Sequence, residues 1–148
     1  MQDKIDFMIQ RIQSLWLFLA AASFFFVFKF PVAGAQTQVG AISELFAASN
    51  LLMFIVAILL GLIALAAIFL FKNRSSQKSL IWLGILLDVV FIVMMYFQME
   101  NLKSNPTLVK QTFKIGAIFP ILYIILMFMA YSGIRKDEKL IKSVDRLR

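Results

Sequence analysis

The stretch SLIWLGILLDVVFIVMMYFQM, Ser79 to Met99, decides the fold because it holds a single charge in an otherwise uncharged run. The hydrocarbon core of a bilayer takes roughly 20 apolar residues of α-helix to span. This stretch has that length, and Asp88 lies near its centre. An ionised carboxylate at that depth costs about 3 kcal/mol on insertion scales. We therefore expect Asp88 to be buried against a partner, protonated, or engaged in a function.

The composition places the whole chain in a membrane. Hydrophobic residues make up 61% and charged residues 16% of the sequence, with a mean hydropathy of +0.87, whereas soluble domains carry about 25% charged residues. The 148 residues are expected to form one membrane domain, 1–148. Cysteine and histidine are absent, which removes the usual zinc ligands, thiolate nucleophiles and disulfides. We expect no enzyme activity, no cofactor and no metal.

Four apolar stretches qualify as transmembrane helices, at about 12–30, 49–71, 79–98 and 115–134. The alternation typical of membrane β-strands is missing from them. The predicted fold is therefore all-α and polytopic, with four transmembrane helices in an up-down bundle. A charged cytoplasmic tail, 135–148, follows as an amphipathic helix.

The first stretch has a second interpretation. Lys4 and Arg11 precede an apolar run, and Ala33-Gly34-Ala35 resembles a signal-peptidase site. Against cleavage, the apolar run exceeds the 7–15 residues of a usual signal core. Helical spacing of apolar residues from Ile5 onward also predicts one continuous helix beginning near Asp3. We favour an uncleaved first helix.

The basic residues predict the orientation. Eleven of the 15 Lys and Arg residues lie in the N-terminus, the second loop and the tail. By the positive-inside rule these segments are cytoplasmic, so both termini face the cytoplasm. Residues 32–45 and 100–114 then face outward. The net charge of +7 mainly reflects the basic residues that set the orientation in the membrane. No nucleic-acid partner is expected.

Asp88 has a candidate neighbour at the same depth. Asp88 in the third stretch and Tyr123 in the fourth both lie near mid-depth, so their side chains could meet and share a hydrogen bond if the helix faces match. One hypothesis is that Asp88 is a neutral group holding two helices together; the other is a proton- or ion-handling site. Because a transport pathway is usually lined by several polar groups, and Ser23 is the other one near mid-depth, we favour the first.

The tail reads RKDEKLIKSVDRLR, 135–148, and carries the second candidate site. Its apolar residues recur at helical spacing. One interpretation is a helix lying on anionic lipid head groups; the other is a docking helix for a partner subunit, because the mixed charges would suit defined pairing. The sequence does not decide between them. The candidate docking residues are Leu140, Ile141, Val144, Asp145, Arg146 and Leu147.

Both ends of the chain resemble one family. The segments are MIQRIQSL at 8–15, GIRKDEKL at 133–140 and SVDRLR at 143–148. They are similar to a Bacteroidota family catalogued as domain of unknown function 4293, over residues 8–148. The resemblance implies a four-span protein of the bacterial inner membrane. It implies no activity and no site residues, and it makes Met8 an alternative to Met1 as the translation start.

These observations predict a small non-enzymatic membrane protein, an accessory or structural subunit of an inner-membrane assembly. A small proton-coupled transporter or channel using Asp88 is the alternative. The expected partners are the lipid bilayer, anionic lipid head groups at the tail, and a partner subunit or a second copy of the chain.

Overall fold

The computed structural model describes residues 2–37, 40, 42–103 and 108–145. Four long helices account for most of them: α1 (Gln2–Lys29), α2 (Leu51–Phe69), α3 (Arg74–Lys103) and α4 (Ile118–Asp145). Short 3-10 turns precede α2 (Ala47–Ser49), link α2 to α3 (Leu70–Lys72) and precede α4 (Ile115–Ala117). As predicted, the first helix is continuous from near the N-terminus to just before Pro31.

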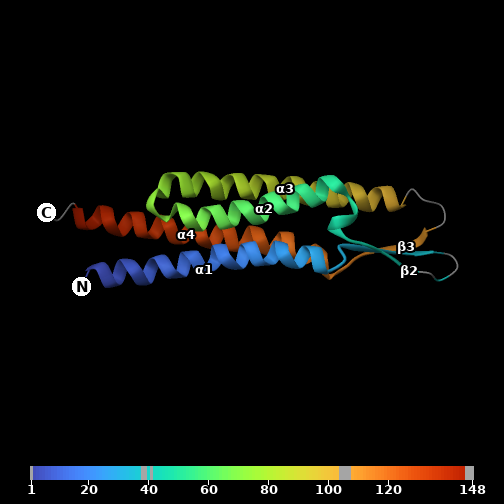
Figure 1. Cartoon of the computed structure of the whole chain (residues 1–148), viewed down its shortest axis with the longest axis horizontal. Helices are drawn as coiled ribbons and strands as arrows, with labels where there is room; N and C mark the ends of the chain where they lie inside the picture. Colours follow the sequence, from blue (N-terminus) through green and yellow to red (C-terminus); the bar gives the residue numbers. More distant parts are fainter. Residues whose placement is uncertain (1, 38–39, 41, 104–107, 146–148) are drawn as a thin grey trace.

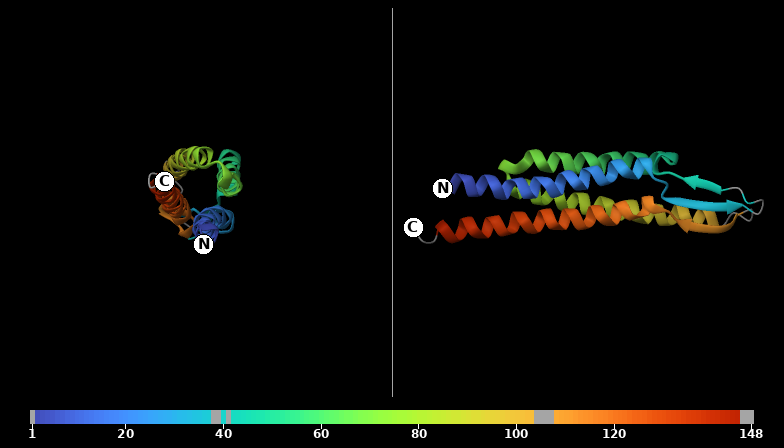
Figure 2. Two further views of the ribbon diagram at one scale, coloured as in Figure 1. Left: turned by 90° about the vertical axis from the view of Figure 1, so that its left-hand side faces the viewer. Right: turned by 90° about the horizontal axis from the view of Figure 1, so that it is seen from below.

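The helices run up and down side by side (Figure 1). Seen along the long axis they form a square in chain order, with α4 returning to lie beside α1 (Figure 2). Both termini lie at one end of the bundle, which we call the terminal end. There, α1 and α4 project beyond the turn between α2 and α3 in both side views.

Asparagine side chains start two of the helices. The Asn50 side-chain oxygen accepts from the backbone N–H groups of Leu52 (2.9 Å) and Met53 (3.3 Å) at the start of α2. The Asn73 side chain accepts from Ser76 N–H (3.3 Å) at the start of α3. These caps satisfy donors that the first turn of a helix leaves unpaired. They fix the places where the chain turns between the helices.

Three described helical segments are long and apolar enough to cross a bilayer: Leu51–Phe69, Arg74–Leu102 and Ile115–Lys139. In α1 the segment Gln13–Lys29 is apolar but shorter. Large apolar side chains cover the outside of the bundle; Phe25 is 78% exposed and Leu51 72%. Because soluble domains rarely expose apolar patches of this extent, the surface is that of a membrane protein.

Each helix buries one stripe of residues spaced three and four apart. In α2 the stripe contains Met53, Ala57, Leu60, Ala64 and Ala67, and the small alanines let neighbouring helices approach closely. Asp88 lies on the stripe of α3, between Ile85 and Phe91. Its place in the core therefore follows from the register of its helix. The other stripes are Leu17, Ala20, Phe24 and Val27 in α1 and Tyr123, Met127, Ala130 and Ile134 in α4.

The fold is not purely helical, which corrects the all-α prediction. A three-stranded antiparallel sheet lies at the end opposite the termini, in the order β2 (Ile42–Leu45), β1 (Ala33–Thr37), β3 (Leu108–Phe113). Ala33 pairs with Leu45 on one side and with Phe113 on the other. Sequence reasoning treated these segments as loops, because the strands are short and their partners are distant in the chain.

Gly116 joins the sheet to the bundle. Its N–H donates to the Pro31 carbonyl (3.0 Å), and a Cβ at this position would lie 2.6 Å from that oxygen. The neighbouring Lys114 N–H donates to the Val32 carbonyl (3.1 Å). Because the obstructing atoms belong to the backbone, a side chain at residue 116 would force the two segments apart.

The described part of the tail is helical, as predicted. It is a direct continuation of α4, which runs without a break to Asp145. Its first residues pack against the same chain: Asp137 is 8% exposed. The next residue, Glu138, forms an ion pair with Lys78 of α3.

Candidate functional site

The first candidate site is a layer in the middle of the bundle to which all four helices contribute. Phe24 of α1 makes edge-to-face contacts with Phe91 of α3 (ring centroids 5.5 Å apart) and with Tyr123 of α4 (4.8 Å). The Tyr123 hydroxyl donates to the Leu60 carbonyl of α2 (3.2 Å). These residues and Asp88 form what we call the core layer. Both diagonals of the square are thus bridged at one depth.

Gly84 makes room for the tyrosine. A Cβ at this position would lie 2.8 Å from the Tyr123 hydroxyl oxygen and 3.1 Å from a methyl carbon of Ile63. Gly84 is one helical turn before Asp88 on α3, so Tyr123 contacts the same helix one turn away from Asp88.

The expected hydrogen bond between them is absent. The Tyr123 hydroxyl donates instead to the Leu60 carbonyl. Among the described residues neither carboxyl oxygen of Asp88 has a hydrogen-bond partner. Asp88 is nevertheless completely buried. A buried polar group without a partner destabilises a structure. On α3 the carboxyl lies about one turn from Ile85 and Phe91, which are buried in the apolar core.

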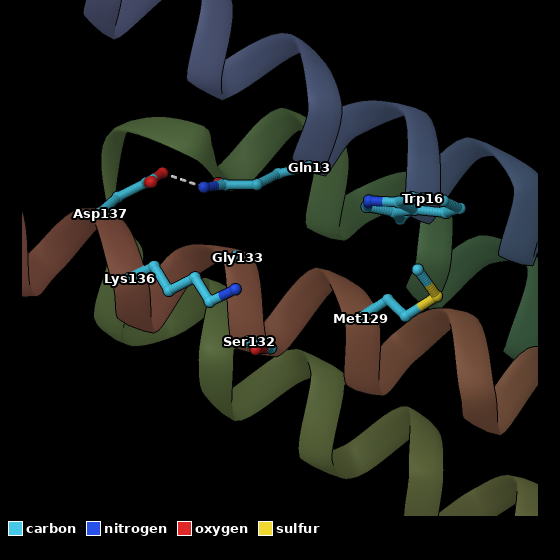
Figure 3. A pocket seen from close by; sticks show the side chains of 7 residues that line it. All are labelled: Gln13, Trp16, Met129, Ser132, Gly133, Lys136 and Asp137. Atoms are coloured by element: carbon cyan, nitrogen blue, oxygen red, sulfur yellow. Dashed lines mark hydrogen bonds between the residues drawn. The ribbon is translucent and has the colours of Figure 1, made fainter.

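The second candidate site is polar and lies at the terminal end. The Gln13 side-chain amide of α1 donates to the Asp137 carboxylate of α4 (Figure 3). Both side chains are 8% exposed. Gly133, one turn before Asp137, lets the Gln13 side chain lie against α4, since a Cβ there would be 3.0 Å from Gln13 Cγ. This bond ties the first helix to the last.

Two further bonds fasten α3 to its neighbours at the same end. Lys78 forms an ion pair with Glu138 (2.7 Å), each side chain being 27% exposed. The Gln77 side chain donates to the Ala67 carbonyl (2.9 Å) near the end of α2. We call Gln13, Gln77, Lys78, Asp137 and Glu138 the terminal cluster. Sequence reasoning missed the terminal cluster. The available signal was that Gln13 and Gln77 each stand at the edge of an apolar run.

A groove of about 330 Å³ opens beside the Gln13–Asp137 bond, between α1 and α4. Trp16 and Met129 form its apolar part, and Lys136 and Ser132 its polar part. In the described part of the chain, no three acidic side chains are grouped so as to hold a metal ion.

The tail candidates are only partly located. Leu140, Ile141, Val144 and Asp145 lie in the last turns of α4, beyond the terminal cluster. Arg146 and Leu147 lie outside the described residues. The backbone of the described residues 140–145 thus continues away from the bundle on a helix.

Comparison with known proteins gives one match. The model of a family described as domain of unknown function (DUF4293) matches residues 9–147. No curated protein and no solved structure matches the chain.

Proposed function

The chain belongs to that family of unknown function, and we propose that it is a non-enzymatic, four-span accessory or structural subunit of an inner-membrane assembly. The observation that carries this proposal is the closed core layer. The middle of the bundle is filled by aromatic and aliphatic side chains around Asp88, which suits a structural element better than a pathway.

The buried polar groups support this reading. Those among the described residues are Gln13, Ser23, Gln77, Asp88 and Asp137. Gln13, Gln77 and Asp137 belong to the terminal cluster. The Ser23 hydroxyl donates to the Ala20 carbonyl of its own helix (2.7 Å). In the described structure no series of polar groups connects Asp88 to either end, whereas transporters line their paths with several.

The proposed topology has four spans with both termini in the cytoplasm. Its support is the common position of the termini (Figure 1) together with the excess of Lys and Arg at that end. Phe24 supports α1 as the fourth span, because it completes the core layer. A chain without native cysteine suits labelling with an impermeant thiol reagent. Intact cells should label Thr37→Cys and Asn105→Cys but not Ser76→Cys; the reverse pattern inverts the topology.

The proposed docking element is the end of α4. It projects with the start of α1 beyond the α2–α3 turn (Figure 1), where a partner could reach both helices. The partner would contact Leu140, Ile141, Val144 and Leu147, with Asp145 and Arg146 supplying defined charge pairs.

Copurification in mild detergent tests this proposal. A stable partner, or a second copy of the chain, should be retained by the native protein and lost with Leu140→Asp. Asp145→Lys should also weaken retention, because it reverses one charge of the pairing. Glu44→Lys is the matched control, since Glu44 is exposed in β2 at the opposite end. Equal retention by all variants would contradict docking through α4.

Proton-coupled transport is the second candidate, favoured by one observation: the carboxyl of Asp88 is buried without a hydrogen-bond partner among the described residues. Asp88→Asn keeps the shape of the side chain and removes its proton. If a strain that depends on this protein grows normally with Asp88→Asn, transport through Asp88 is excluded. Loss of growth with the assembly intact would instead overturn the subunit proposal.

A further inference from the structure

A second groove, of about 470 Å³, lies along the exposed face of α4 near the terminal end. Its lining changes along the helix from apolar to basic: Phe128, Tyr131, Ser132, Arg135, Lys136 and Lys139. We call it the basic groove. Trp82 of α3 borders its apolar part, with its ring 6.0 Å from that of Phe128 and 5.9 Å from that of Tyr131.

The acidic and basic side chains of this part of α4 point in different directions. The two acidic residues turn toward the bundle, where Asp137 binds Gln13 and Glu138 binds Lys78. Arg135, Lys136 and Lys139 are exposed. The Arg135 guanidinium lies over the Tyr131 ring, 5.9 Å from its centre. A sequence of mixed charges thus presents a purely cationic face, because its acids are already engaged.

This face suits a ligand with an anionic head and an apolar body. Arginine and lysine bind phosphate. Along α4 the basic residues begin one turn after the aromatic ones, which matches a lipid whose acyl chains lie toward the bilayer centre and whose phosphate lies at the surface. A free anion would make no favourable contact with the aromatic part of the groove. Basic surfaces beside transmembrane helices on the cytoplasmic side favour anionic lipid head groups.

We propose that the basic groove binds one anionic phospholipid of the leaflet at the terminal end. Its phosphate lies between Arg135 and Lys139, within reach of the Ser132 hydroxyl, and an acyl chain runs along Phe128 and Trp82. This lipid site rests on the proposed function, because it assumes the proposed placement in the membrane. It requires no partner subunit.

Quenching of tryptophan fluorescence tests the proposal, because the chain has just two tryptophans, Trp16 and Trp82. The full chain with Trp16→Phe is reconstituted in phosphatidylcholine containing a small fraction of lipid brominated on its acyl chains. Brominated phosphatidylglycerol should quench Trp82 more than brominated phosphatidylcholine does. With Trp82→Phe, Trp16 reports on the other groove and should distinguish the two lipids less. Equal quenching of Trp82 by both lipids overturns the proposal.

Charge removal locates the site. Arg135→Gln with Lys139→Gln should weaken the preference for phosphatidylglycerol by roughly 25-fold, about fivefold for each charge. The matched control removes two exposed charges at the opposite end, Lys29→Gln with Lys110→Gln, and should keep the preference of Trp82. Equal loss in both double variants overturns a defined site in favour of general attraction.

Inorganic phosphate separates a lipid from a free anion. Excess phosphate, with chloride at equal ionic strength as its control, should leave the quenching unchanged. Specific displacement by phosphate would overturn the lipid assignment. These measurements use the purified chain without a partner, so failure of the lipid site leaves the copurification test of the subunit proposal unaffected.

Discussion

The carboxyl groups of the core layer and of the terminal cluster differ in their hydrogen bonding. In the core layer, Asp88 is enclosed by rings and aliphatic groups, and no described residue bonds to it. In the terminal cluster, Asp137 and Glu138 each bind a side chain of another helix. In the middle the helices are therefore held together by packing and by the Tyr123–Leu60 hydrogen bond, and at one end by bonds between polar side chains that include these carboxyl groups.

This difference has a physical basis. Between membrane helices there is little hydrophobic driving force, so close packing must supply the attraction at mid-depth. Edge-to-face ring pairs such as those of Phe24 add about 0.5–1.5 kcal/mol each. At the terminal end the side chains of Lys78 and Glu138 are partly exposed, so charged groups keep some hydration there and pairing them is less demanding.

Removing a core ring should have the largest effect. Phe24→Ala should lower the free energy of unfolding by about 3–5 kcal/mol, because it deletes a buried ring that contacts two others. The matched control is the adjacent Phe25→Ala, since Phe25 is 78% exposed and should change stability by less than about 0.5 kcal/mol. Unfolding in mixed micelles with increasing denaturing detergent measures both. Similar losses would show that the core layer is not where packing holds the bundle.

Breaking the Gln13–Asp137 bond should have the next largest effect. Asp137→Ala leaves the Gln13 amide buried without this acceptor and should cost about 1–3 kcal/mol. Replacing both residues, Gln13→Leu with Asp137→Ala, should restore part of the loss, because no polar group is then stranded. The same unfolding assay applies. A double variant less stable than the single one would mean that Asp137 acts mainly through other contacts.

The ion pair of Lys78 and Glu138 should contribute less. Each side chain is 27% exposed, so a double-mutant cycle with Lys78→Ala and Glu138→Ala should give a coupling of about 0.2–1 kcal/mol. The coupling should fall as salt is raised from low to physiological ionic strength. Lys139→Ala combined with Glu138→Ala serves as the control pair. A coupling above 1 kcal/mol that salt does not reduce would contradict this exposure argument.

Asp88→Ala should have the smallest effect, although Asp88 is more deeply buried than Asp137. The carboxyl has no hydrogen bond to a described residue, and removing it relieves a desolvation cost that offsets the small cavity left behind. The free energy of unfolding should therefore change by less than about 0.5 kcal/mol. The same substitution at Asp137 gives the direct comparison. A loss of 0.6–2 kcal/mol at Asp88 would instead fit a bonded residue joining two helices, which is the interpretation reached from the sequence.

Several features of the site could be predicted and others could not. The depth of Asp88 and Tyr123 followed from counting residues, because helical rise is constant. The acceptor of the Tyr123 hydroxyl did not, because it is a backbone carbonyl of a third helix. Glu138 pairs with Lys78, which lies 60 residues earlier in the chain. Local spacing cannot identify a partner on another helix.

The amino-acid sequence by itself determined the helices and their apolar character. In a bilayer every backbone polar group must be satisfied internally, so a long uncharged run leaves few alternatives. Only the tertiary structure decided three features: the sheet of β1, β2 and β3, the burial of the Asp88 carboxyl without a hydrogen bond to any described residue, and the separation of acidic from basic side chains on α4. These depend on which helix faces and strand edges meet, and that is a property of the assembled chain.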